Sequence, residues 1–153
     1  LLEGDAATRD WLRALKGHAR SYAGELGVVL GVARGQVDVG FANHYYTLRM
    51  KQGQPDADVE LAFTNEDAGS LMNASGALLL GDRALGADFL RYLLTREVQS
   101  YLAREAFEIP LAAGVAMPEG LPPLAEIGPP ALDLTRLANL EPTLALMREA
   151  GVL

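Results

Sequence analysis

The chain has 153 residues, half of them hydrophobic and 22% charged, a composition typical of a globular protein with a core of its own. Its net charge of −7 argues against nucleic-acid binding, which depends on Lys and Arg neutralising phosphates. The lack of Cys excludes disulfides and thiolate chemistry, and no apolar run approaches the ~18 residues that span a bilayer.

The first half of the chain alternates between helical and strand-like patterns. Trp11 and Leu15 share one face of a helix that Asp5 can cap. Apolar residues occupy positions 37, 39 and 41, an alternation typical of a half-buried strand. We therefore expect helices over residues 5–15, 25–34 and 47–52, and strands over residues 37–42 and 59–63.

The pattern continues in the second half. Residues 75–80 end in an apolar run and are predicted to form a buried strand. A helix is predicted over residues 84–94, and Thr95 can cap the helix that follows it. The side chains expected to face the core from the first of these helices are Phe89, Leu90, Leu93 and Leu94.

The last forty residues differ in composition from the rest of the chain. Residues 118–130 are rich in Pro and Gly and are predicted to run as an extended surface strap. Asn139 can cap a final helix that carries Pro142 in its first turn. Because strands alternate with helices along the chain, the sequence indicates an α/β fold.

Two adjacent tyrosines, Tyr45 and Tyr46, follow Asn43 and His44 between the expected strand at 37–42 and the helix at 47–52. Where a strand turns into a helix, both phenols can lean toward one spot beyond the end of the strand, which is where ligands bind in open α/β sheets. Two phenols beside an imidazole and an amide suit a hard cation, because a strongly acidic metal displaces phenol protons. The alternative is core packing, a common role of Tyr.

The segment Asn43 to Tyr46 resembles the twin-tyrosine motif of periplasmic ferric-iron-binding proteins, the solute-binding components of bacterial ABC importers for Fe(III). The similarity extends in order along nearly the whole chain. Its further segments are residues 4–12 (GDAATRDWL), 67–71 (DAGSL), 75–77 (SGA), 89–99 (FLRYLLTREVQ), 107–111 (FEIPL), 118–122 (PEGLP) and 134–153.

The resemblance implies a fold and a domain organisation. The fold would be the type II periplasmic-binding-protein-like α/β fold, represented by its C-terminal half as a mixed sheet flanked by helices. Residues 1–75 would belong to the C-terminal lobe, residues 76–125 would return toward the N-terminal lobe, and residues 126–153 would form a strap and helix packed on the C-terminal lobe. Since the chain starts without Met or a secretion signal, we expect part of a longer protein, whose missing N-terminal half would leave strand edges that favour dimerisation or swapping.

The same resemblance implies roles for the residues of the motif. Tyr45 and Tyr46 match the two phenolate ligands of Fe(III). Asn43 matches an amide that contacts a synergistic anion, phosphate or carbonate, although a plain helix N-cap is an equal alternative. The counterpart of His44 is often not a ligand, so we expect a supporting histidine there.

One position departs from the family pattern. Where relatives commonly carry a second anion-binding Asn, this chain has Glu25, and a negative side chain there disfavours an anion. Glu25 could supply a carboxylate to the site, or it could serve the positive end of its own helix. Tyr22 is an additional candidate ligand, with core packing as the alternative.

The expected function is ferric-ion capture in the periplasm, or on a lipid anchor outside a Gram-positive cell, with delivery to an ABC permease in the inner membrane. Two alternatives remain: a solute-binding protein for an organic anion or a polyamine, and an enzyme using Tyr as acid and base. No catalytic residue is identified, since the chain has two His, no Cys and no Gly-rich phosphate loop, so an enzyme is disfavoured. By itself the chain is expected to bind iron weakly, because two phenolates leave a hard cation under-coordinated.

Overall fold

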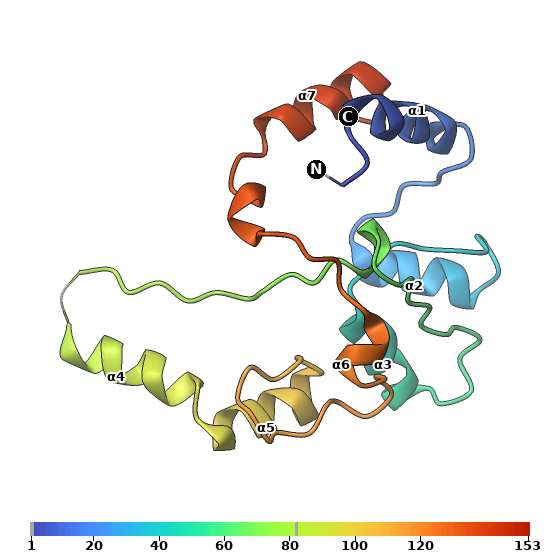
Figure 1. Cartoon of the computed structure of the whole chain (residues 1–153). Helices are drawn as coiled ribbons and strands as arrows, with labels where there is room; N and C mark the ends of the chain where they lie inside the picture. The colour runs from blue at the N-terminus through green and yellow to red at the C-terminus, as the bar shows by residue number, and fades with distance from the viewer. Residues whose placement is uncertain (1, 82) are drawn as a thin grey trace. The chain divides into compact units, whose positions relative to one another are not determined.

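The computed structural model describes residues 2–81 and 83–153, and helices connected by extended segments make up this part of the chain (Figure 1). The longer helices match the expected ones to within a few residues at each end, as periodicity predicts. They are α1 (Asp5–Lys16), α2 (Glu25–Ala33), α3 (His44–Gly53), α4 (Ala84–Leu93), α5 (Arg96–Ala106) and α7 (Glu141–Ala150). Shorter elements are η1 (Ala68–Ser70), α6 (Leu124–Ile127) and η2 (Leu134–Leu137).

The predicted mixed sheet is wrong. Within the described residues no segment pairs as a strand, and the three expected strands at 37–42, 59–63 and 75–80 run without regular structure. A strand needs a neighbour to bond its backbone groups, and none lies beside these segments in the described chain. Val39 is accordingly 75% exposed and Leu78 83% exposed, although both were expected to pack in a sheet.

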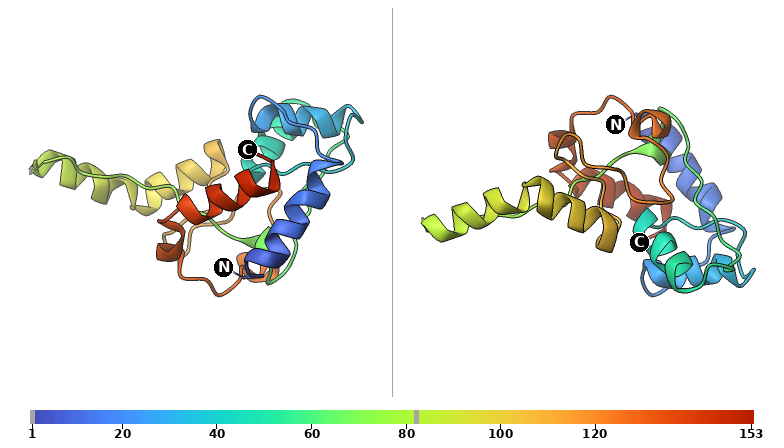
Figure 2. Two further views of the ribbon diagram at one scale, coloured as in Figure 1. Left: turned by 90° about the horizontal axis from the view of Figure 1, so that it is seen from above. Right: turned by 90° about the horizontal axis from the view of Figure 1, so that it is seen from below.

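The structure divides into two compact units. Unit 1 comprises residues 1–21, 63–73 and 128–153. In it α1 packs against α7, and the Arg9 Nε donates to Glu149 Oε2 across 3.0 Å. Figure 2 shows these two helices side by side. The buried Ser70 Oγ donates to the carbonyl of Gly128 across 3.1 Å, which ties residues 63–73 to the C-terminal segment.

Unit 2 comprises residues 22–62 and 74–127 and carries all of the candidate site residues. Helix α2 packs against α3 (Figure 2). Val29 of α2 and Leu48 of α3 are buried. A second buried group forms around α5 and contains Val98, Ala103 and Phe107. The assignment of residues to two lobes stays a prediction.

The helix ends show which capping expectations hold. Thr95 is the N-cap of α5, and its Oγ1 accepts from the Val98 N–H, as predicted. The Asn139 Oδ1 accepts from the Glu141 N–H, but the N-cap of α7 is Leu140, so Asn139 lies one residue before the cap that it was expected to form. The N-cap of α1 is Gly4, so Asp5 is the first helical residue and not the cap. The expected extended strap contains the short helix α6, which buries Ile127.

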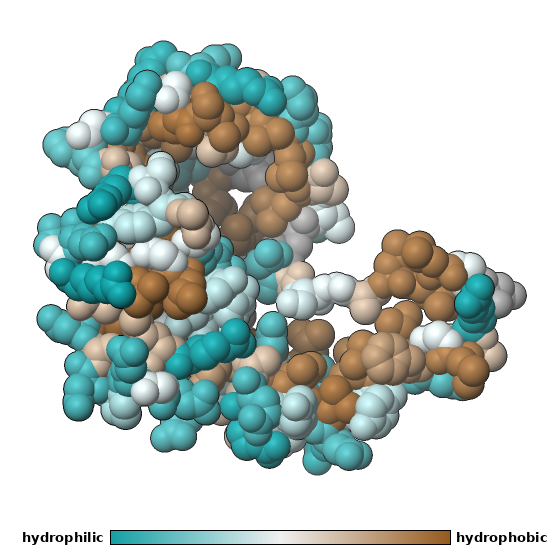
Figure 3. Space-filling view, turned by 180° about the vertical axis from the view of Figure 1, so that it is seen from behind, coloured by the Kyte–Doolittle hydropathy of each residue, from teal (hydrophilic) through white to brown (hydrophobic). Residues whose placement is uncertain are grey.

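The apolar face of α4 is exposed, against the expectation that it faces the core. Phe89 is 58% exposed and Leu94 59% exposed, and the structure buries no residue of α4. The neighbouring extended segment exposes Leu78 and Leu80 as well. Figure 3 shows hydrophobic side chains gathered over this part of unit 2. Helical periodicity identified the apolar face correctly but not whether anything covers it.

Candidate metal centre

The twin-tyrosine segment begins helix α3. Asn43 is the N-cap, with extended backbone angles (φ −65°, ψ 140°), and His44 is the first helical residue. Thr47 and Leu48, one turn later, are buried against the rest of unit 2. Tyr45 and Tyr46 therefore stand in the first turn, where the helix leaves its first N–H groups without intrahelical partners.

The two tyrosine rings lie together. Their centroids are 4.7 Å apart with an interplanar angle of 43°. The His44 ring meets Tyr45 edge-on, with centroids 5.5 Å apart. Both tyrosines are half-buried, so each keeps one part packed and another part open to solvent. This arrangement presents two phenols close to each other at an accessible helix start.

His44 is hydrogen-bonded to the end of α5, in the same unit. Its Nε2 lies 2.7 Å from the carbonyl oxygen of Phe107, and since a carbonyl only accepts, Nε2 carries the proton and donates. Phe107 ends α5 in the left-handed conformation with φ 60°, which turns its carbonyl and the following Glu108 out of the helix. His44 thus fastens the start of α3 to the end of α5.

Asn43 does not cap α3 with its side chain. Its side-chain Nδ2 donates to Glu25 Oε2 at 2.9 Å and to Glu25 Oε1 at 3.1 Å. Its backbone N–H also donates to Glu25 Oε2, across 3.3 Å. Glu25 is half-buried and is the first residue of α2, so one carboxylate joins the first turns of two helices. The structure therefore brings Glu25 directly to the twin-tyrosine segment.

The electrostatic surroundings favour a protonated Tyr45 phenol before a cation binds. Desolvation by burial raises its pKa above the ordinary value of 10.0, followed by the charges of Tyr46 and Glu25, a side-chain hydrogen bond with Tyr46, and the charge of Glu108. A cation placed among these groups reverses the balance, because it stabilises the phenolate and is attracted by both carboxylates.

Glu108 is the member of this group that the sequence did not identify. It lies in the 107–111 segment, which was noted only for its similarity to relatives, and its charge acts on Tyr45 across 63 positions of the chain. No local pattern signals such a contact. Its neighbour Phe107, which holds His44, brings it there.

Tyr22 is placed apart from this group. Its ring covers glycines of α2, so closely that a Cβ built on Gly31 would lie 2.5 Å from the Tyr22 hydroxyl oxygen. That hydroxyl also donates to Gln36 Oε1 across 3.3 Å. The phenol of Tyr22 thus lies over the C-terminal half of α2, whereas Glu25 stands at the first residue of that helix.

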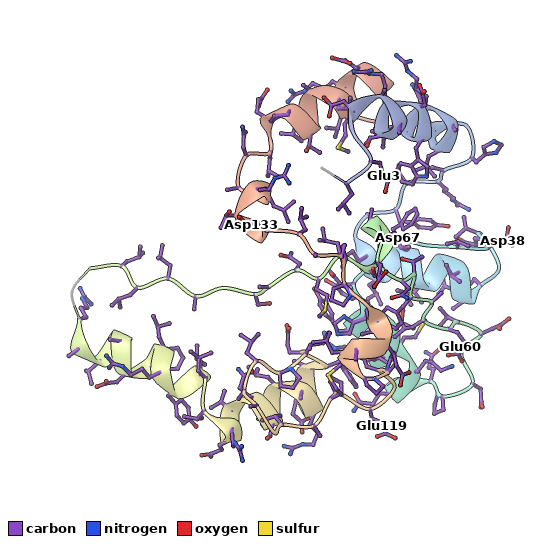
Figure 4. All side chains as sticks on the ribbon, in the orientation of Figure 1. Glu3, Asp38, Glu60, Asp67, Glu119 and Asp133 are labelled. Carbon is purple, nitrogen blue, oxygen red and sulfur yellow. The ribbon has the colours of Figure 1, made fainter. Side chains whose placement is uncertain are left out.

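Carboxylate and imidazole side chains form no metal-binding cluster in the described part of the chain, the surroundings of the tyrosine pair included. In residues 2–81 and 83–153, no three or more His, Asp or Glu side chains come together as a metal-binding group. In unit 2 the carboxylates of Asp38, Glu60 and Glu119 stand on separate loops in Figure 4. In unit 1 Asp67 serves its own turn, where its Oδ1 accepts from the Gly69 N–H at 2.7 Å. None of the helices described is long and apolar enough to cross a bilayer.

Known proteins show similarity along nearly the whole chain. The Fe(3+)-binding periplasmic protein of Serratia marcescens is 31% identical over 159 residues, which cover 99% of this chain and 47% of that protein. The major ferric iron-binding protein of Neisseria meningitidis is 28% identical, with 99% and 47% covered. Iron uptake protein A2 of Synechocystis is 32% identical, with 98% and 48% covered.

The chain thus spans about half the length of these relatives. No family model matches it. The names of the relatives describe iron binding and iron uptake. The resemblance indicated by the sequence motifs is confirmed: along nearly its whole length, the chain is similar to about half of a periplasmic ferric-iron-binding protein.

Proposed function

We propose that this chain provides the tyrosine-bearing part of a ferric-ion site, in a solute-binding protein that works outside the cytoplasmic membrane. Fe(III) is the cargo, Tyr45 and Tyr46 bind it as phenolates, and the loaded protein delivers it to a membrane permease. The observation that carries the proposal is the pair of phenol rings 4.7 Å apart at the start of α3.

The chemistry of the surrounding donors supports a hard trivalent cation. Tyr45 and Tyr46 offer phenol oxygens, and Glu25 and Glu108 bring negative charge to Tyr45. Hard cations prefer such oxygen ligands. His44 donates its Nε2 proton to Phe107, and we assign it the role of holding the segment in place. The relatives named for ferric-iron binding support the same choice of cargo.

A visible-absorbance titration tests the proposal. Fe(III) is supplied as its nitrilotriacetate chelate, whose own donors complete the coordination that this chain leaves open. We expect a phenolate-to-iron charge-transfer band that saturates at one iron per chain. The Tyr45→Phe and Tyr46→Phe variants should each lose part of the band, and the double variant should lose all of it.

Tyr92→Phe is the matched control, because Tyr92 is an exposed tyrosine of α4 in the same unit. This variant should keep the full band. An unchanged band in the double variant, or no band in the unmodified chain, would contradict the ferric site. Delivery to a permease requires a separate test, in which the iron-loaded protein restores uptake to permease-containing vesicles.

A further inference from the structure

The carboxylate of Glu25 occupies the position where an anion would bind at the start of α3. It accepts from the Asn43 backbone N–H at 3.3 Å and from the Asn43 side-chain amide at 2.9 and 3.1 Å. The start of a helix attracts anions through its free N–H groups and the positive end of its dipole. Here the Asn43 donors at this helix start are already bonded by a side chain of the protein itself.

Glu25 is fixed there from its other side as well. It is the first residue of α2, so its charge also lies at the positive end of that helix. The packing of α2 against α3 holds these two helix starts together, and Val29 of α2 is buried. A free phosphate or carbonate could reach Asn43 only by displacing a carboxylate that is half-buried and bonded at both oxygens.

The charges around the site offset that of Fe(III) without an added anion. Two phenolates and the carboxylates of Glu25 and Glu108, whose charges both act on Tyr45, carry four negative charges against three positive ones. The carboxylate of Glu25 is hydrogen-bonded to Asn43, two residues before Tyr45, and its charge acts on the Tyr45 phenol. An external dianion would add to this excess of negative charge, and like charges brought close together repel.

We propose that Glu25 is the built-in anion of this site: it holds Asn43 and the start of α3 in place of phosphate or carbonate, so that the tyrosine pair takes Fe(III) without a synergistic anion. The claim that Fe(III) binds without a synergistic anion rests on the proposed ferric function. The claim that Glu25 occupies the Asn43 donors concerns the metal-free chain and is tested separately.

The first test uses the metal-free protein. Sodium phosphate, and in a second series sodium formate, is titrated into the 15N-labelled chain while the backbone and side-chain amide signals of Asn43 are followed by NMR. The unmodified chain should show no saturable shift. Glu25→Ala should show one with either anion, because its Asn43 donors are free. A saturable shift in the unmodified chain would overturn the proposal, and this result does not require the variant to fold.

The second test measures the apparent Kd for Fe(III) in buffer free of phosphate and bicarbonate, and again after phosphate is added. For the unmodified chain the two values should agree within about twofold. Glu25→Ala should bind at least about tenfold more weakly, because it loses a charge-assisted set of hydrogen bonds, and phosphate or formate should restore most of that loss. A Kd of the unmodified chain that improves about tenfold with phosphate would overturn the proposal.

Glu119→Ala is the matched control, because it removes the same charge from an exposed position of unit 2 (Figure 4). It should bind Fe(III) like the unmodified chain, with or without phosphate; a loss equal to that of Glu25→Ala would show that net charge alone is responsible and would overturn the assignment. If the unmodified chain forms no tyrosine-dependent iron complex, the ferric function fails, while the NMR titration still decides whether Glu25 takes the place of an anion.

Discussion

Replacing Gly31 by Ala tests the packing that holds α2, and with it Glu25, in place. Gly31 is buried, and a Cβ there would lie 2.5 Å from Oη, 2.6 Å from Cζ and 2.9 Å from Cε1 of Tyr22. Ordinary contacts between such atoms begin at about 3.5 Å, so the ring must move by ~1 Å. That movement also strains the 3.3 Å hydrogen bond from Tyr22 to Gln36.

Two opposing contributions set the size of the effect. Ala is favoured over Gly in a helix interior by about 0.5–1 kcal/mol. Overpacking a filled site costs about 1–3 kcal/mol. We therefore expect Gly31→Ala to lower the free energy of unfolding by roughly 1 kcal/mol. In a Tyr22→Ala background the clash is absent, and the same substitution should raise the free energy of unfolding by about 0.5–1 kcal/mol.

Urea unfolding followed by tyrosine fluorescence is the suitable assay, because all five tyrosines of the chain lie in unit 2, whereas the single tryptophan, Trp11, lies in unit 1. Gly53→Ala is the control: it is the last residue of α3, and a Cβ there meets nothing within 4 Å. It should be neutral or slightly stabilising. If Gly31→Ala stabilises the protein equally with and without the Tyr22 ring, the packing of Tyr22 on α2 is wrong.

Three further predictions concern pH and capping. Each phenol that binds as phenolate releases one proton, and the pKa of Tyr45 is raised by desolvation and by its neighbours, so both phenols are protonated in the metal-free chain at neutral pH. Fe(III) affinity should therefore rise with pH across the acid-to-neutral range, by up to about two log units per pH unit. Competition with a weak chelator at several pH values measures this, and an affinity independent of pH would contradict phenolate binding. Thr95→Ala should cost about 1 kcal/mol of unfolding free energy and Thr95→Ser should cost little, because the Thr95 hydroxyl accepts from the Val98 N–H at 3.4 Å. Equal losses for the two variants in urea unfolding would exclude the cap. The pKa of Asp67 is lowered, first by the hydroxyl of Thr64 and then by the Gly69 N–H, so its contribution to stability is present above about pH 4 and is lost as the pH falls through its folded-state pKa. The loss of unfolding free energy in Asp67→Asn should therefore shrink below about pH 4. A loss that stays constant in acid would contradict the assignment.

The sequence predicted the features that depend on residues close to each other along the chain. The helices follow from apolar periodicity and from capping residues such as Thr95, and both signals lie within a few positions of the element they define. The expected strands failed for the opposite reason. Alternation at Val37, Val39 and Phe41 reports that one face could be buried, but pairing depends on a partner segment, and nothing pairs with them in the part of the chain described.

The candidate site likewise has features that the sequence predicted and features that it did not. The adjacency of Tyr45 and Tyr46 is local, so the motif could be read directly. The partnership of Asn43 with Glu25 joins residues 18 positions apart, and the sequence did not predict it. The expected roles were an anion contact or a helix N-cap for Asn43, and a site carboxylate or a helix-start charge for Glu25. Glu108 was missed because its approach to Tyr45 depends on how the end of α5 meets α3, which no spacing in the sequence reveals.

Resonance Raman spectroscopy of the ferric complex tests the central claim most directly. The chain is prepared with ring-deuterated tyrosine, and the spectrum is excited within the visible charge-transfer band. If Tyr45 and Tyr46 bind Fe(III), the enhanced vibrations are those of tyrosinate, they shift with the label, and they vanish in the Tyr45→Phe/Tyr46→Phe variant. Enhanced vibrations that do not shift with the label, or that persist in the double variant, would show that the iron is bound elsewhere.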